Sequence, residues 1–136
     1  MHSHSHIRFI AVILLAAMGW TCKNSIEVNQ DEKNRNALVA IQLESDFLDD
    51  SVAVEFDSQT LYIGRAVTNY SVNLAWSSQQ LIVSTGIHAV RVMVFGSNIT
   101  SEIFAYVKDT TIVTANYDRQ NGQLIFRTYD HFIPRR

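Results

Sequence analysis

The sequence predicts an all-β fold, an antiparallel sandwich of about eight or nine short strands. Three observations lead to this prediction. From residue 37 onward, apolar and polar side chains alternate with a period of two, as they do in strands with one buried face. Turn-forming residues interrupt the alternation about every ten positions. After the first 21 residues, no stretch of ten or more residues has the apolar spacing of an amphipathic helix.

The chain begins with a segment typical of a secretory signal. Arg8 precedes an apolar run from Phe9 to Met18, and a few small or polar residues then lead to Cys22. A basic start, a short apolar stretch and a polar exit are the parts of a signal peptide. The apolar run is too short to cross a membrane, which takes about 20 such residues. We therefore expect residues 1–21 to be a signal peptide.

The exit from the signal allows more than one outcome. The small residues Ala17 and Gly19 fit an ordinary cut before Trp20. The Gly-Trp-Thr-Cys run that ends at Cys22 resembles a bacterial lipobox, from which its Trp and Thr depart. Cys22 is the only cysteine and has no disulfide partner, and lipid attachment would explain it. Lipidation at Cys22 is the expectation we favour, ahead of ordinary secretion and of an uncleaved anchor.

The rest of the chain divides into a tether and one domain. Residues 22–36 are almost entirely polar and form a flexible tether, and residues 37–136 form the sandwich domain. Loss of Arg8 with the signal leaves 10 basic residues (11 − 1) against 13 acidic ones, so nucleic-acid binding has no electrostatic basis. His2, His4 and His6 would leave with the signal, so we assign them no metal role.

The first predicted elements lie between residues 47 and 76. A single helical turn is expected at 47–50. Val52, Val54 and Phe56 share one face of a strand, and Asp57-Ser58 forms a tight turn into a second strand around 61–63. Residues 70–76 alternate again, which predicts a strand with Tyr70, Val72, Leu74 and Trp76 on one face.

The remaining strands follow at similar spacing. Val90, Val92 and Val94 share one face, and residues 103–107 form another alternating set. The clearest hairpin joins 111–117 to 123–129, because its Asn121-Gly122 pair suits the positive φ angles of a short loop. We expect the core to include Val54, Phe56, Leu74, Val92 and Phe126.

Two stretches of this pattern resemble a known kind of domain. Residues 52–62, Val-Ala-Val-Glu-Phe-Asp-Ser-Gln-Thr-Leu-Tyr, resemble the V-x-V-D-G-x-x-L hairpin of small extracytoplasmic Ig-like sandwiches. Residues 85–92, Thr-Gly-Ile-His-Ala-Val-Arg-Val, resemble their P-G-x-H-x-V-x-V strand, which PEGA-type surface modules share. Ser58 and Thr85 replace the usual glycine and proline.

The closing hairpin also resembles the end of small bacterial lipoproteins, and the likeness covers roughly residues 37–130. The resemblance implies an Ig-like, PEGA-like sandwich of the cell envelope, and it brings no catalytic residues with it.

The residues themselves also give little support to catalysis or to a cofactor. No nucleophile elbow, zinc-protease helix, phosphate-binding glycine loop or Cys-x-x-Cys motif is present, so we expect no enzyme activity. His88 falls on the same strand face as Val90 and Val92, so we interpret it as a structural residue. His131 lies in the C-terminal tail.

The acidic cluster of Glu44, Asp46, Asp49 and Asp50 is the best candidate for an ion site. Carboxylates are ligands for Ca²⁺, but the spacing matches no EF-hand, and aspartate is an ordinary loop residue. We therefore expect a solvated loop and no metal, with Asp46, Asp49 and Asp50 as weak candidates.

Three aromatic residues are candidates for ligand binding: Tyr62, Tyr106 and Trp76. Tyr62 is expected to point to solvent, opposite Leu61 and Ile63, and Tyr106 to lie on an outer face. Trp76 is by default a core residue. Exposed tyrosines can form a binding platform, although they are also common strand residues.

The function expected from these observations is a structural or protein-interaction role. The chain would be a non-enzymatic, exported and lipid-anchored protein of the bacterial cell envelope, with an unknown protein or glycan partner. The alternative is a carbohydrate- or small-ligand-binding module of a nutrient-acquisition system. Clustering of Tyr62, Tyr106 or Trp76 on one surface would favour that alternative, and an exposed unpaired edge strand would favour binding by strand addition.

Overall fold

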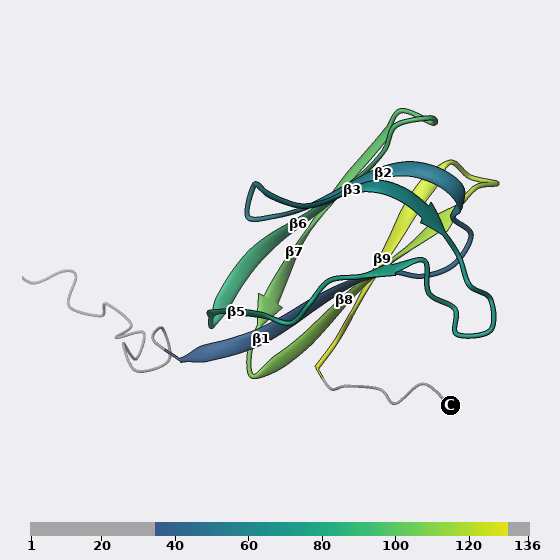
Figure 1. The fold of residues 1–136 in the computed structure, drawn as a ribbon. Helices are drawn as coiled ribbons and strands as arrows, with labels where there is room; N and C mark the ends of the chain where they lie inside the picture. The colour runs from purple at the N-terminus through teal and green to yellow at the C-terminus, as the bar shows by residue number, and fades with distance from the viewer. Residues whose placement is uncertain (1–34, 131–136) are drawn as a thin grey trace, which may run out of the picture.

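The computed structural model describes residues 35–130, which form two β-sheets packed face to face (Figure 1). This confirms the predicted all-β sandwich. The described residues contain no helix, and therefore none that could cross a membrane. The nine strands are β1 (Asn36–Leu43), β2 (Leu48–Phe56), β3 (Gln59–Val67), β4 (Trp76–Ser77), β5 (Leu81–Ser84), β6 (Gly86–Val94), β7 (Ile99–Val107), β8 (Thr110–Asp118) and β9 (Gln123–Tyr129).

The signal segment, Cys22, nearly all of the tether and His131 lie outside the described residues.

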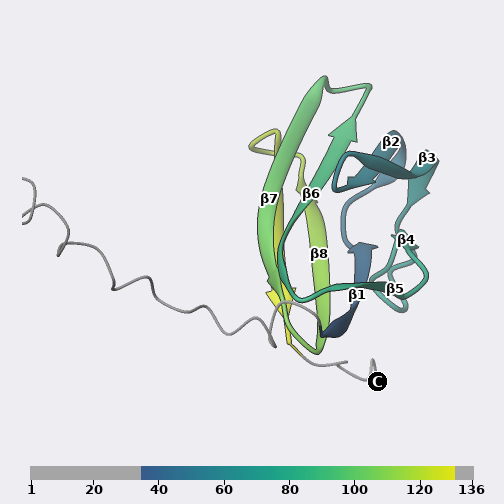
Figure 2. The ribbon, with the colours of Figure 1, turned by 90° about the vertical axis from the view of Figure 1, so that its left-hand side faces the viewer.

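One sheet contains the first strand and the last two strands of the chain together with β4 and β5, and the other contains β2, β3, β6 and β7 (Figure 2). The first sheet has the order β4-β1-β8-β9, and β5 pairs with the start of β1 on the same side as β4. The other has the order β3-β2-β6-β7. Every strand pair is antiparallel except β1 with β8, which run parallel. This parallel pair joins strands far apart in sequence, so the local alternation of side chains could not predict it.

The core lies between the sheets and is made mostly of small branched side chains. The predicted inward residues Val54, Phe56 and Val92 are buried, and Phe126 is half-buried and packs against them. Leu74 is an exception, because it lies in a loop outside the core cluster. Fully excluded side chains on the two sheets include Val39, Ile41, Leu43, Val52, Val90, Val107 and Val113.

Both predicted hairpin turns are present. Asp57 and Ser58 join β2 to β3 with φ angles of 48° and 66°, which identify the mirror-image type of two-residue turn. Gly122, in the loop between β8 and β9, has a φ of 62°. These turns match the right-handed twist of the strands that they connect, which is why such residues mark hairpins in the sequence.

The strand predicted at residues 70–76 is wrong. Only Trp76 and Ser77 form a strand, and Tyr70 and Val72 are exposed in a compact loop. The Asn69 side chain accepts a hydrogen bond from Ser71 N at 3.0 Å, and the Asn69 and Leu74 backbones bond to each other. Such local bonds compete with a sheet ladder, so the alternation here has no structural role.

The predicted helical turn at residues 47–50 is also wrong, because β2 begins at Leu48. Phe47 is fully buried at the end of the core and contacts the Tyr117 ring at 5.7 Å. Its N–H donates to Thr68 Oγ1 at 3.0 Å, and its carbonyl accepts from Thr68 N at 2.8 Å. These bonds to a distant segment hold Phe47 in extended backbone.

Candidate functional site

Both edges of the β3-β2-β6-β7 sheet, β3 and β7, lack a strand partner within residues 35–130. β7 is the last strand of that sheet, and Figure 2 shows it at the outer border. An edge strand presents free N–H and C=O groups that can pair with another chain. The unpaired side of β7 is therefore the first feature to examine as a binding site.

The hydrogen bonds of β6 show which residues of β7 face the free side. Asp57 N donates to Ala89 O at 2.9 Å, and Ala89 N donates to Asp57 Oδ1 at 2.9 Å, so the peptide groups of Ala89 point toward β2. Alternate residues of a strand point their peptide groups to opposite sides, so those of Val90 point toward β7. Val90 is opposite Ile103, whose peptide groups therefore bond to β6.

By the same alternation, the peptide groups of Thr100, Glu102, Phe104 and Tyr106 point away from β6, toward the free side.

β7 has few of the features that commonly protect an edge. Its nine residues include no proline, glycine or lysine, its register with β6 has no bulge, and its one charged side chain, Glu102, is paired with Arg91. The opposite edge strand, β3, contains Gly64 and Arg65, and its pairing with β2 has two register shifts. Proteins use charges, bulges and short strands to prevent unwanted pairing. A long and regular edge with so little protection is therefore unusual unless it binds something.

Large apolar side chains are exposed beside this edge. Ile87, Phe104 and Tyr106 are 71%, 69% and 55% exposed, and Ile87 is directly opposite Tyr106. We call the three side chains, with the free peptide groups of residues 100, 102, 104 and 106, the β7 face. Tyr106 lies on an outer face, as the sequence predicts.

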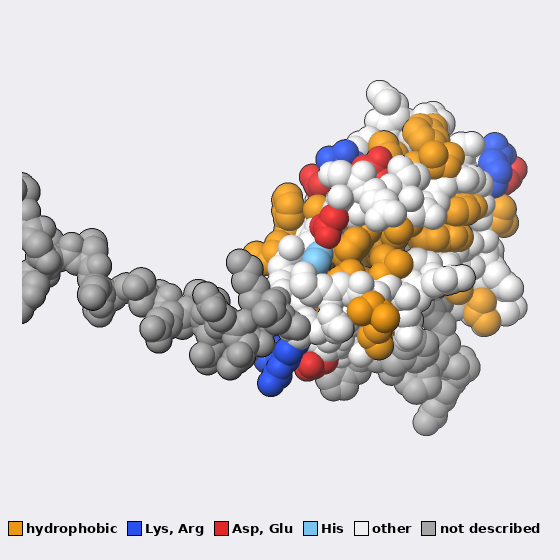
Figure 3. All heavy atoms as spheres, turned by 60° about the vertical axis from the view of Figure 1, so that its left-hand side comes forward, with side chains coloured by type: hydrophobic (Ala, Val, Ile, Leu, Met, Phe, Trp, Pro, Cys, Tyr) orange, Lys and Arg blue, Asp and Glu red, His pale blue; other side chains and the backbone are white. Residues whose placement is uncertain are grey.

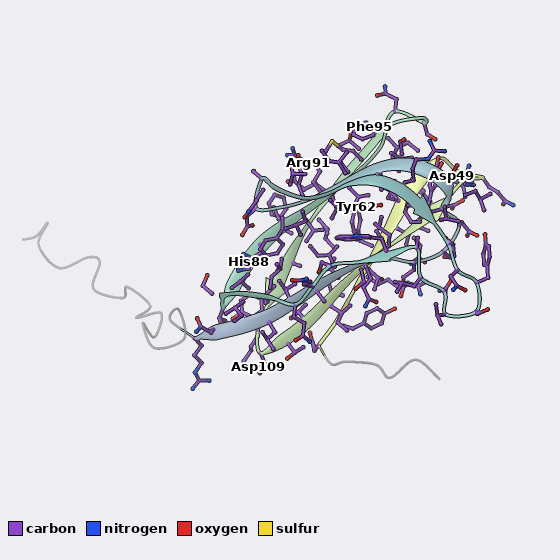
Figure 4. All side chains as sticks on the ribbon, viewed as in Figure 1. Asp49, Tyr62, His88, Arg91, Phe95 and Asp109 are labelled. Atoms are coloured by element: carbon purple, nitrogen blue, oxygen red, sulfur yellow. The ribbon has the colours of Figure 1, made fainter. Side chains whose placement is uncertain are left out.

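An ion-pair row borders the β7 face. Arg91 Nη1 lies 3.3 Å from Glu55 Oε2, and Arg91 Nη2 lies 3.4 Å from Glu102 Oε1. Figure 4 shows Arg91 on the side of its sheet that faces away from the core. One guanidinium thus serves two carboxylates, which leaves this row with one net negative charge beside Phe104.

Tyr62 points inward, which corrects the prediction that it faces solvent. It is opposite the buried Val54, and its ring stacks on Trp76 at a centroid distance of 4.8 Å (Figure 4). Its hydroxyl donates to Arg65 O at 2.8 Å. A Cβ on Gly64 would lie 2.5 Å from that hydroxyl oxygen, so the glycine makes room for the ring. Ile63 is the outward residue, at 70% exposure.

The three candidate aromatics therefore do not form one surface. Tyr62 and Trp76 are half-buried together where β3 and β4 meet, against the core. Tyr106 is on β7, at the opposite edge of the sheet that contains β3. Tyr62 and Trp76 lie together, but they are half-buried against the core and do not expose their rings on one outer surface with Tyr106.

The acidic loop forms ion pairs with arginines. Asp49 pairs with Arg65, and Asp50 pairs with Arg119. The hydrogen bond from Arg65 is the main reason that the pKa of Asp49 lies below its usual value. Within residues 35–130, no group of three or more histidine, cysteine, aspartate or glutamate side chains is arranged to hold a metal ion, and Asp46 is a loop residue with a φ of 68°.

An open depression of about 610 Å³ lies at the end of the sandwich, between the β1–β2 loop and the β8–β9 hairpin. Many of its polar groups bond to one another. Asn116 Oδ1 accepts from Ser45 Oγ at 2.6 Å, Arg119 Nε donates to Asp46 O at 2.9 Å, and Asp118 accepts from Asn121 Nδ2 at 2.7 Å. The first two bonds join the two loops, and the third lies within the β8–β9 hairpin, so much of the polar lining is engaged in bonds within the protein.

His88 is a buried structural residue, as predicted. Its Nδ1 lies 2.6 Å from Asp57 Oδ2, and its Nε2 lies 2.7 Å from Ser84 O. Figure 3 shows the His88 side chain beside an acidic one. Both partners are acceptors, so both ring nitrogens donate only when the imidazole is protonated.

Burial is the largest influence on the pKa of His88 and lowers it. The hydrogen bonds to Asp57 and Ser84, with the charge of Asp57, together outweigh burial and leave the pKa above 6.5. The His88–Asp57 pair ties the β2–β3 turn to β6, and the bond to Ser84 O ties His88 to the end of β5.

Comparison of the chain with protein-family models and with curated proteins finds no match.

Proposed function

We propose that this protein is a non-enzymatic interaction module of the bacterial cell envelope, and that the β7 face binds an extended protein segment. The observation that carries the proposal is the free and little-protected edge of β7, with Phe104 and Tyr106 exposed along it. An added strand would bond to the four free peptide groups of β7, and its side chains would pack against the two aromatic rings. In strand addition, backbone bonds provide affinity and side-chain contacts provide specificity.

The proposed location at the envelope depends on the N-terminal segment. Lipidation of Cys22 after removal of residues 1–21 would attach the chain to a membrane. Stable attachment takes more than one acyl chain, which the multiply acylated cysteine of a bacterial lipoprotein provides. The polar residues that follow would hold the domain a short distance from the lipid, so that the β7 face could reach a partner.

Carbohydrate binding has less support as a function. Sugar recognition would use exposed aromatic rings on one surface, whereas Tyr62 and Trp76 cover each other at the far edge of the sheet from Tyr106. The depression between the loops has polar walls, but their groups are largely engaged in bonds to one another.

Site-specific photo-crosslinking tests the proposal. A photoreactive amino acid replaces Phe104 in the full chain, expressed in its native cells, and a matched chain carries it at Ile63. Both positions are about 70% exposed and lie on the outer face of the same sheet, at opposite edges. We expect a discrete protein adduct from position 104 and none from 63. Equal adducts from both positions, or none from 104, would contradict the proposal.

A further inference from the structure

We propose that the segment which binds the β7 face is β7 of a second copy of this chain, antiparallel about a two-fold axis at Ala105. This inference rests on the proposed function, because it names the occupant of the same free edge. Three features favour this occupant: the order of side chains along β7, the direction of its peptide groups and the charge of the ion-pair row beside it.

The outward side chains of β7 are self-complementary when read in opposite directions. They are Thr100, Glu102, Phe104 and Tyr106, and the next position in the alternation is the exposed Lys108, directly after the strand ends. With the axis at residue 105, a residue of one copy lies opposite a residue of the other copy when their two numbers sum to 210. Glu102 then faces Lys108 of the second copy, and Phe104 faces Tyr106. Opposite charges and aromatic pairs are favourable cross-strand neighbours.

The direction of the peptide groups agrees with this register. Residues 102, 104 and 106 point their N–H and C=O groups to the free side, as derived above from the bonds of Ala89. Phe104 and Tyr106 of the second copy would therefore meet as hydrogen-bonded pairs, each exchanging two N–H···O bonds. The two sheets would join into one continuous sheet across the axis, with Ala105 opposite Ala105.

The charges beside the edge favour this arrangement. Arg91 forms ion pairs with both Glu55 and Glu102, so the row has one negative charge that no cation within it neutralises. Lys108 is exposed and forms no ion pair within residues 35–130. Pairing about residue 105 places one Lys108 beside each Glu102, which neutralises the net negative charge of both ion-pair rows.

Other registers lack this match. An axis at residue 102 would place Glu102 opposite Glu102, and like charges directly opposite are unfavourable. An axis at 103 places Glu102 opposite Phe104, and an axis at 104 places it opposite Tyr106, which leaves the carboxylate without a cation. A symmetric interface uses the same patch on both subunits, so only a self-complementary order of side chains fits it.

Sedimentation equilibrium of the full chain, in a density-matched detergent, tests the proposal from about 1 to 500 µM, because a single strand pair makes a small and weak interface. We expect a monomer–dimer equilibrium in this range. K108E should weaken the dimer about tenfold or more, since two attractions per dimer become repulsions. The double variant E102K/K108E reverses both charges and should restore most of the affinity. A monomer throughout the range, or no recovery in the double variant, would overturn the inference.

A second pair of variants keeps the test specific to the β7 face. F104R should abolish the dimer, whereas I63R, an equally exposed residue on the opposite edge strand, should leave it intact. Circular dichroism melting confirms that each variant is folded. Equal effects of F104R and I63R would overturn the inference.

The crosslinking experiment separates this inference from the proposed function. An adduct from position 104 with twice the mass of the chain supports the second copy. An adduct of another mass contradicts the inference that the partner is a second copy, and it is still consistent with the proposed interaction module. No adduct contradicts both.

Discussion

Replacement of Asp57 by asparagine should lower stability and change how stability depends on pH. Asparagine adopts the positive φ of this turn position and still accepts a hydrogen bond from Ala89 N, so the substitution mainly removes the charge that faces His88. A hydrogen bond to a charged group contributes about 1.5–3 kcal/mol. Because the Asp57 side chain is 46% exposed, solvent screening reduces the expected loss to about 1–2 kcal/mol below pH 6.

The sign of the pH dependence follows from the raised pKa of His88. Below pH 6.5, its unperturbed value, the imidazole is protonated in both the folded and the unfolded chain, and the pair contributes its full stability. As the pH rises through the higher pKa of the folded state, the charge is lost and the contribution disappears. The wild-type chain should therefore lose stability above pH 6.5, and Asp57→Asn should show a smaller loss, since burial alone lowers the pKa of His88.

Urea unfolding at pH 5.5, 7 and 8.5 measures both the loss of stability and its pH dependence. The free energy of unfolding is taken from the urea concentration at the midpoint, with the dependence on urea concentration held constant. Asp49→Asn is the matched control. Its carboxylate is also paired, but the pKa of Asp49 lies below 3.8, so it stays ionised throughout this range. Two results would refute the hypothesis that His88 is protonated in its pair with Asp57. One is a wild-type chain that gains stability between pH 7 and 8.5, and the other is parallel pH profiles for wild type and Asp57→Asn.

Three further predictions concern the core, the acidic loop and the N-terminus. Phe47→Ala should cost about 3–5 kcal/mol in urea unfolding, whereas Leu48→Ala, at a 55% exposed position, should cost under about 1; similar losses would contradict the burial of Phe47. Melting curves with EDTA and with excess Ca²⁺ should superimpose, and a rise of several degrees that disappears in Asp46→Asn would identify a calcium site. Cys22→Ser should release the chain from membrane fractions, and intact mass showing an unmodified chain that begins at Trp20 would exclude lipidation.

The alternation of side chains and the turn residues were enough to predict the fold class and the faces of the most regular strands. Val90, Val92 and Val94 point inward because an alternating strand on a core must bury its branched side chains. Asp57-Ser58 and the glycine at 122 mark hairpins because few residues accept positive φ angles at low cost. These are local properties, and any chain with the same pattern would show them. The exposure of Tyr106 follows from the same alternation.

Which strand lies at an edge, and therefore where a partner can bind, depends on how the strands assemble into sheets. The free side of β7 depends on the order β3-β2-β6-β7, and the alternation within each strand is the same in any order. Tyr62 points inward because an edge strand with a glycine two positions away leaves room for its ring against Trp76. The alternation at residues 70–76 was misleading, since side-chain bonds of Asn69 close a loop there. Contacts between distant segments set each of these features, and a periodic pattern contains no information about them.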